Sequence, residues 1–423
     1  MEQIVITGGN PLSGNIHISG AKNAALPLMA CALLTDEVLN LSNVPNLADI
    51  ETLSKLLEGH GTKITHTDVE KYGFTLNMHT EEITSTVAPY ELVCTMRASV
   101  LVLGPLLARK RQARVSLPGG CAIGARPVDL HLKGLEAMGA SIEIVDGYIV
   151  ASAPQGLQGV VYEFPFVSVG ATENIMMAAS LANGKTTLCR SAREPEIVDL
   201  AKCLNAMGAK VSGAGTDTIV IEGVGTLHGA NHKVLADRIE AGSFACVAGA
   251  CGGDITLTGI EPTTLDVPLD VLRRAGVEII KGEDSIRIIG RALHGVDITT
   301  EPYPGFPTDL QAQFMAMFSV ASGSSIISET IFENRFMHVP ELSRLGADIA
   351  LDGNVAKVRG VGELHGADVM ATDLRASMCL VIAGLKAMGQ TRISRIYHLD
   401  RGYSGLEEKL KVVGADIERI ARV

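Results

Sequence analysis

The chain has 423 residues, of which 47% are hydrophobic and 20% are charged, and its formal net charge is −11 at pH 7. This composition is typical of a folded globular protein with large cores, and the length predicts two or more domains. The acidic balance argues against a nucleic-acid-binding protein, and no apolar run approaches the ~20 residues that a membrane span needs.

The N-terminus, Met1 to Val5, lacks the basic segment and apolar stretch of a signal peptide. The eight cysteines form no C-x-x-C pair, and most of them lie in apolar runs. We therefore expect a reduced, cytoplasmic protein without a bound metal ion. The sequence leaves the oligomeric state open.

Apolar helices are expected at intervals along the chain, and each is apolar nearly all round, which is typical of a buried helix. They are predicted at residues 24–34, 98–108, 174–182, 243–250, 310–321 and 376–385. Each is followed by an expected strand, a loop and an amphipathic helix. A glycine ends each amphipathic helix in the phrase apolar-x-Gly-Ala-x-Ile or a close variant, at Gly61, Gly139, Gly208, Gly276, Gly346 and Gly414.

Two short strands follow each of these glycines, for example at residues 142–144 and 148–150. The repeating unit is thus helix–strand–loop–helix–strand–strand, and six copies occur at intervals of roughly 70 residues. Six units are too many for one core, so we expect two domains of three units each. The buried helices would form the centre of each domain and the sheets its outside.

Cations recur where helices of these units begin, and free backbone N–H groups at such positions favour anions. For a single arginine, helix capping or a solvated charge is the ordinary explanation. Recurrence at equivalent positions favours a shared anion site instead. The residues concerned are Lys22, Arg97, Arg126, Arg335, Arg375 and Arg401.

Two further side chains could carry chemistry. Cys121 lies in a glycine-rich loop beside Arg126, where a thiol can act as a proton donor or, once deprotonated, as a nucleophile. Asp309 follows Tyr303-Pro304-Gly305-Phe306-Pro307-Thr308 at the start of an apolar helix. An incidental loop cysteine and an ordinary helix-capping carboxylate remain the alternatives.

Long segments of the chain resemble the family of UDP-N-acetylglucosamine enolpyruvyl transferases, within the EPSP synthase superfamily. The resemblance is collinear over essentially the whole chain. It is carried by residues 20–27, 117–131, 168–174, 306–313, 333–342 and 372–376, which read GAKNAALP, LPGGCAIGARPVDLH, SVGATEN, FPTDLQAQ, ENRFMHVPEL and TDLRA.

The resemblance implies an α/β fold, namely the two-domain inside-out α/β barrel of enolpyruvyl transferases, with the active site between the domains. The expected N-terminal domain is 22–235, and the expected C-terminal domain is 1–21 plus 236–423. The segment before Lys22 would thus return to the C-terminal domain.

The implied reaction transfers the enolpyruvyl group of phosphoenolpyruvate to the 3-hydroxyl of UDP-N-acetylglucosamine, through a tetrahedral ketal and with release of phosphate. It would be the first committed step of peptidoglycan synthesis, on which cell-wall biogenesis, cell shape and cell division depend. No cofactor is implied. Epoxide inhibitors of the fosfomycin type would alkylate Cys121.

The resemblance also implies residue roles. Cys121 would donate a proton to carbon 3 of phosphoenolpyruvate, and Asp309 would accept the proton of the sugar hydroxyl. Lys22, Arg126 and Arg401 would hold phosphoenolpyruvate, supported by Arg97 and Arg375. UDP would lie along Pro127, Val128, Asp129 and Leu130, with its phosphates near Ser168, Val169 and Gly170, while Asn23, Asp309 and Ile331 would contact the sugar.

Two positions depart from the pattern of some family members and bear on nucleotide contacts. Leu101 stands where some members have tryptophan, and Phe166 stands where some have lysine. Two alternatives remain at this level: the sister enzyme that uses shikimate 3-phosphate, and a non-catalytic paralogue that binds nucleotide sugars.

Overall fold

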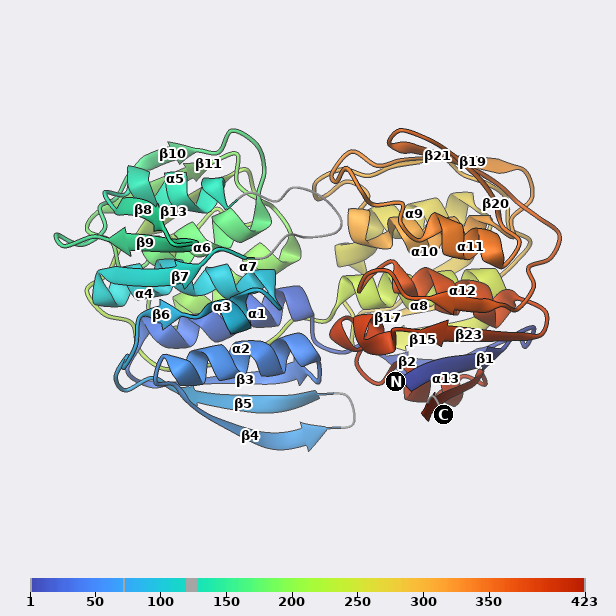
Figure 1. Cartoon of the computed structure of the whole chain (residues 1–423), viewed down its shortest axis with the longest axis horizontal. Coiled ribbons are helices and arrows are strands. Elements are labelled where there is room, and N and C mark those ends of the chain that lie inside the picture. The colour runs from blue at the N-terminus through green and yellow to red at the C-terminus, as the bar shows by residue number, and fades with distance from the viewer. Residues whose placement is uncertain (1, 71–72, 119–127, 422–423) are drawn as a thin grey trace. The chain divides into compact units, whose positions relative to one another are not determined.

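The computed structural model describes residues 2–70, 73–118 and 128–421, and side chains at 68–70 are outside this description (Figure 1). The described chain forms two compact units. Unit 1 contains residues 2–19 and 236–421, and unit 2 contains residues 20–118 and 128–235. Each unit has its own hydrophobic core, so each is described by itself.

Six four-stranded sheets repeat one topology, three in each unit. A short edge strand pairs in parallel with its neighbour, and the other two pairings are antiparallel. Unit 2 has β14 (Ala230–Lys233), β3 (Val38–Pro45), β5 (Gly73–His79) and β4 (Lys63–Glu70); β6 (Val87–Ala88), β7 (Gln112–Ser116), β9 (Tyr148–Ser152) and β8 (Ser141–Val145); and β10 (Val161–Glu163), β11 (Lys185–Cys189), β13 (Thr218–Glu222) and β12 (Lys210–Ser212).

The sheets of unit 1 have the same order of roles. They are β2 (Ser13–His17), β15 (Asp254–Thr258), β17 (Ser285–Ile289) and β16 (Glu278–Lys281); β18 (Ile298–Thr299), β19 (Ser324–Ser328), β21 (Val355–Arg359) and β20 (Asp348–Asp352); and β22 (Asp368–Met370), β23 (Gln390–Ser394), β1 (Glu2–Thr7) and β24 (Asp416–Ala421).

Each repeat also has a buried helix before its second strand. In unit 1 the three buried helices contact one another, and the inward side chains of the sheets pack around them. The buried helices are α1 (Lys22–Ala30), α4 (Leu103–Lys110), α6 (Val169–Ala179), α8 (Arg238–Cys251), α10 (Gln311–Phe318) and α12 (Ser377–Lys386). Helices therefore lie inside and sheets outside, which confirms the predicted fold class and its six repeats.

Amphipathic helices connect the second strand of each repeat to the final pair. They are α2 (Ala48–Gly59), α5 (Asp129–Ala137), α7 (Pro195–Ala206), α9 (Asp266–Arg274), α11 (Val339–Arg344) and α13 (Leu406–Val412). The shorter elements are α3 (Tyr90–Val93) and the 3-10 turns Cys31–Leu34, Arg97–Val102, Pro262–Leu265, Thr308–Leu310 and Ile396–Arg401.

The glycine that recurs after each amphipathic helix has a positive φ, between +93° at Gly139 and +105° at Gly61. Other residues adopt this left-handed backbone only with strain, so glycine there lets the chain leave the helix and enter the next strand. The repeated phrase in the sequence thus marks the helix end, as predicted.

The short edge strand that precedes each buried helix was not predicted from the sequence. Two of these strands belong to one unit, while the helix that follows them belongs to the other. Strand β2 pairs with β15 of unit 1 and leads into α1 of unit 2, and β14 pairs with β3 of unit 2 and leads into α8 of unit 1. Within the residues that the structure describes, the chain passes from one unit to the other at these two places.

Strand β1 lies between β23 and β24, the last two strands of the chain (Figure 1). Its register pairs Ile4 with Ile393 on one side and with Arg419 on the other. The beginning of the chain therefore belongs to unit 1, and it supplies a central strand of that sheet. In the described ranges, none of the helices has the length and apolarity to cross a membrane.

Candidate active site

Asp309 is the best-defined candidate in unit 1. It lies in the 3-10 turn Thr308–Leu310 that opens α10, and its backbone carbonyl accepts a hydrogen bond from Gln313 Nε2 at 2.9 Å. Arg335 Nη2 donates to Asp309 Oδ1 at 2.7 Å, and Arg375 Nε lies 3.9 Å from Asp309 Oδ2. The Asp309 side chain is 26% exposed, so this carboxylate is oriented by two cations yet remains accessible.

Arg335 approaches Asp309 from the loop before α11. Its guanidinium is buried and lies over the ring of Phe332, 5.4 Å from the ring centroid. Burial acts to lower the pKa of Arg335, but the negative charge of Asp309, with those of Asp373 and Glu329, outweighs it and raises that pKa. Arg335 therefore remains a full cation beside Asp309.

Arg375 is buried, lies two residues before α12 and connects three segments of unit 1. Its Nη2 donates to Asp237 Oδ2 at 3.1 Å, and its Nη1 donates to the carbonyl of Gly402 at 3.1 Å. Asp237 also caps α8, since its Oδ1 accepts the N–H groups of Ile239 and Glu240. Burial opposes the positive charge of Arg375, but Asp237 and its other neighbours raise the Arg375 pKa.

A buried hydroxyl completes this network beneath Arg375. Tyr403 Oη lies 2.8 Å from Ser243 Oγ and accepts from Gln313 Nε2 at 3.1 Å. Burial raises the pKa of Tyr403 to about 12, against the lowering effect of Arg375, so the phenol stays neutral. Arg401 is the last residue of the 3-10 turn Ile396–Arg401. It directly precedes Gly402, whose carbonyl accepts the hydrogen bond from Arg375.

Ile331 is held near Asp309 through one carboxylate. Glu329 accepts hydrogen bonds from the backbone N–H of Ile331 at 2.8 Å and from the Thr308 hydroxyl at 2.8 Å. It also accepts from the Thr300 hydroxyl at 2.9 Å. Glu329 thus fixes the loop of Ile331 against the turn that carries Asp309.

In unit 2, Lys22 is the first residue of α1 and is buried. Its Nζ lies 3.0 Å from Asp49 Oδ2 on α2, and the Asp49 side chain is buried as well. The following residue, Asn23, is exposed. The amine therefore has a fixed position and a compensating charge, while the adjacent amide is available at the surface of the unit.

A second group in unit 2 is assembled around His131 on α5. Asn174 Nδ2 donates to His131 Nδ1 at 3.0 Å, and the imidazole lies against Gly170 in the first turn of α6. Burial, and then the charge of Arg97, lower the pKa of His131 to about 4. The ring is therefore neutral at pH 7.

The helix starts around His131 carry the predicted nucleotide residues. Ser168 caps α6, since Ala171 N–H donates to its hydroxyl at 3.4 Å. Val128 occupies the N-cap position of α5 without a side-chain hydrogen bond, and on this helix Asp129 is exposed and Leu130 is buried. Two helix N-termini thus lie near one neutral imidazole, an arrangement that favours an anion.

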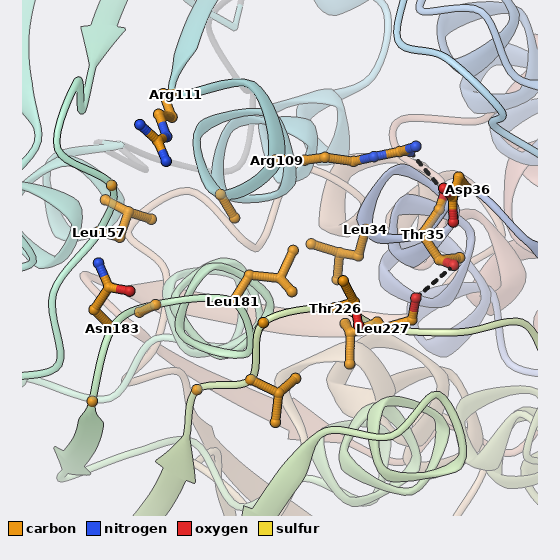
Figure 2. A pocket seen from close by; sticks show the side chains of 17 residues that line it. Leu34, Thr35, Asp36, Arg109, Arg111, Leu157, Leu181, Asn183, Thr226 and Leu227 are labelled. Atoms are coloured by element: carbon orange, nitrogen blue, oxygen red, sulfur yellow. Dashed lines mark hydrogen bonds between the residues drawn. The ribbon is translucent and has the colours of Figure 1, made fainter.

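A separate pocket of about 520 Å³ lies elsewhere in unit 2 (Figure 2). Arg109 Nη1 donates there to the carbonyls of Thr35 at 2.7 Å and Thr80 at 2.9 Å, and Thr35 Oγ1 donates to the carbonyl of Leu227. The Arg109 guanidinium thus binds the carbonyl of Thr35, which follows the 3-10 turn Cys31–Leu34, and the carbonyl of Thr80, which follows β5. None of the predicted site residues lines this pocket, so we do not assign the chemistry to it.

The model of one protein family, described as EPSP synthase (3-phosphoshikimate 1-carboxyvinyltransferase), matches residues 6–410.

The chain belongs to the EPSP synthase family.

Several family members are similar to it over their whole length. Proteins named UDP-N-acetylglucosamine 1-carboxyvinyltransferase are 59% identical in Sinorhizobium fredii and 60% identical in Sinorhizobium medicae, and in both cases the match covers 100% of each chain. The crystal structure of the enolpyruvyl transferase NikO from Streptomyces tendae is similar with 27% identity and a TM-score of 0.89, covering 100% of this chain and 99% of the other. EPSP synthase from Acinetobacter baumannii has the same fold, with 21% identity, full coverage of both chains and a TM-score of 0.77.

Within each of its two units, this EPSP synthase family member brings some of the predicted residues together. Within unit 1, Asp309, Ile331 and Arg375 share one network, and Arg401 adjoins it. Within unit 2, Arg97, Leu130 and Ser168 to Gly170 lie around His131, whereas Lys22 pairs with Asp49. The predictions for Cys121, Arg126 and Pro127 fall outside the described residues.

Three partners of the predicted residues were missed. Asp237 and Asp49 are carboxylates whose distance in sequence from Arg375 and Lys22 gave no indication of pairing. His131 was part of a quoted motif but had no assigned role. Of the two departures from the family pattern, Leu101 is buried in the core of unit 2, and Phe166 is 58% exposed close to Ser168.

Proposed function

We propose that this chain transfers the enolpyruvyl group of phosphoenolpyruvate to the 3-hydroxyl of UDP-N-acetylglucosamine and releases phosphate. Full-length identity of 59–60% to proteins named for that activity is the observation that carries the proposal. We also propose that the reaction serves peptidoglycan synthesis in the cytoplasm, as expected from the sequence.

The proposed reaction has two stages. Asp309 accepts the proton of the sugar 3-hydroxyl while the oxygen attacks carbon 2 of phosphoenolpyruvate, and Cys121 gives a proton to carbon 3. The resulting tetrahedral ketal then loses a proton from carbon 3 and expels phosphate, which leaves the vinyl ether. The orientation of Asp309 by Arg335 supports its part in this scheme, because a base must point at the proton it accepts.

We propose the remaining residues for binding. Lys22, Arg126 and Arg401 hold phosphoenolpyruvate, with Arg97 and Arg375 in support, since several placed cations stabilise the charge that develops on the phosphate and carboxylate. The N-termini of α5 and α6 support a place for the diphosphate of UDP near Val128 to Leu130, Pro127 and Ser168 to Gly170. Asn23 and Ile331 would contact the sugar together with Asp309.

A phosphate-release assay with each acceptor tests the proposal. We expect phosphate release with phosphoenolpyruvate and UDP-N-acetylglucosamine, and none with shikimate 3-phosphate. Turnover with shikimate 3-phosphate alone would assign the sister activity named in the family model. Binding of the nucleotide sugar without any release would indicate a non-catalytic paralogue.

We further propose that an epoxide inhibitor of the fosfomycin type alkylates Cys121. Four of the seven described cysteines are buried, and burial raises the pKa of Cys246 and Cys379 well above its ordinary value, so these thiols should not react. Cys94 is exposed and is the natural competitor. Peptide mass spectrometry should find the adduct on Cys121, and Cys94→Ser should leave the labelling unchanged. An adduct on Cys94 in place of Cys121 would contradict the assignment.

A further inference from the structure

The two oxygens of the Asp309 carboxylate face different arginines. Arg335 Nη2 donates to Oδ1 at 2.7 Å, and Arg375 Nε lies 3.9 Å from Oδ2. The shorter contact is charge-assisted and has the geometry of a strong hydrogen bond. The orientation of this carboxylate is therefore determined mainly by Arg335.

The two arginines also differ in their other partners. Arg375 directs Nη2 at Asp237 and Nη1 at the Gly402 carbonyl, so its charge is largely engaged away from Asp309. Within the described parts of the chain, Asp309 is the carboxylate that forms an ion pair with Arg335. The Arg335 side chain is only 4% exposed, which leaves little surface for a direct contact with a substrate.

We propose that Arg335 is a positioning residue that fixes the Asp309 carboxylate for the reaction and acts on the substrates through Asp309. This inference rests on the proposed function. It assigns to Arg335 a role different from the anion binding suggested by its place in the repeat. Phe332, whose ring lies under the guanidinium, and Glu329, which fixes the Phe332 backbone, hold Arg335 in place.

Charged and titratable groups on all sides must be considered before a pH effect is assigned to this pair. Arg375 faces Asp309, and Asp237 and Tyr403 face Arg375. Asp373, Glu329 and His338 surround Arg335. Burial lowers the pKa of His338 to about 4, so this ring is neutral in the working range and adds no charge. Among the residues that the structure describes, Arg335 and Arg375 are the cations that form ion pairs with the Asp309 carboxylate.

The test compares Arg335→Gln and Arg335→Lys with the wild type in the phosphate-release assay. For Arg335→Gln we expect kcat to fall about 10- to 100-fold, while KM for each substrate changes less than about threefold, because the carboxylate is misplaced but still present. The pH at which kcat is half-maximal on the acidic side should rise, since a neighbouring positive charge is lost. Arg335→Lys keeps the charge, so it should recover part of kcat and reverse most of the pH shift.

A double-mutant cycle separates positioning from direct binding. If Arg335 acts through Asp309, Arg335→Gln should lower the residual kcat of Asp309→Ala by less than about threefold. A full multiplicative loss in that background, or a loss confined to KM, would overturn the proposal. Arg359→Gln removes an exposed arginine of the same unit and serves as the control, with thermal unfolding measured for every variant.

The wild type in the same assay distinguishes failure of this inference from failure of the proposed function. An active wild type with unchanged kcat in Arg335→Gln refutes the positioning role alone. If the wild type turns over shikimate 3-phosphate instead, the acceptor assignment fails, and the cycle is measured with that acceptor. A wild type that releases no phosphate with either acceptor refutes both.

Discussion

Replacing Asp309 by alanine is expected to lower kcat by about 10²- to 10⁴-fold, the usual contribution of a positioned general base. The affinity for UDP-N-acetylglucosamine should change little, because the carboxylate is one contact among many. The phosphate-release assay at saturating substrate measures kcat, and calorimetric titration measures the affinity for the nucleotide sugar. An equal loss in both would assign Asp309 a structural role.

Asp309→Asn is the matched variant, because alanine also leaves the buried Arg335 without its ion-pair partner. The asparagine side-chain oxygen can still accept the hydrogen bond from Arg335 Nη2. We therefore expect Asp309→Asn to keep the unfolding temperature near that of the wild type and still to lose kcat. Recovery of kcat in Asp309→Asn would show that charge at this position is dispensable.

Among the variants proposed, replacing Lys409 by methionine is expected to lower the free energy of unfolding the most. Lys409 Nζ lies 2.7 Å from Glu240 Oε1 and 2.6 Å from Ser19 Oγ, and the side chains of Lys409 and Glu240 are only 1% and 2% exposed. Removing one member of a buried pair leaves an uncompensated charge, at a cost of about 3–5 kcal/mol. Thermal unfolding should show a decrease in Tm on the order of 10 °C.

The pH dependence of this loss identifies Glu240 as its cause. Burial raises the pKa of Glu240 above its ordinary value of 4.5, although Lys409 acts in the opposite direction. Without Lys409 that pKa rises further, so the folded state takes up a proton more readily than the unfolded chain. The stability deficit should therefore grow as the pH rises above 4.5 and shrink on acidification.

Two comparisons complete the experiment. Lys409→Met combined with Glu240→Gln removes both charges and should recover much of the lost Tm. Lys55→Met breaks an ion pair with Glu51 whose side chains are 59% and 71% exposed, and it should leave Tm unchanged. A deficit in Lys409→Met that neither Glu240→Gln nor acid reduces would mean that lost packing, and not the buried charge, is responsible.

The sequence predicted the repeating parts of the fold because they have strong local patterns. Six buried helices are apolar nearly all round, and six glycines end amphipathic helices with positive φ. Four of the edge strands were missed because β6 and β18 have only two residues each and β10 and β22 only three, too few for an alternating pattern. The pairing of β2 with β15 and of β14 with β3 joins residues far apart in the sequence, and local sequence patterns cannot predict such pairing.

The candidate site was predicted less completely, because a sequence shows a charge but not its partner. Arg335 and Arg375 were recognised as recurrent cations, yet both are buried and paired with carboxylates, Asp309 and Asp237. Lys22 was recognised in the same way and pairs with Asp49. The partner of Arg375 is 138 residues away in the chain, so its identity could come only from the folded structure.

The place of β1 between β23 and β24 has a consequence for protein synthesis. Strand β1 is synthesised well before its pairing partners, residues 390–393 and 416–421. All described residues of unit 2 lie between 20 and 235, so that unit can be completed while translation continues. Nascent β1 must therefore wait unpaired until residues 416–421 have been synthesised, and this sheet of unit 1 closes only then.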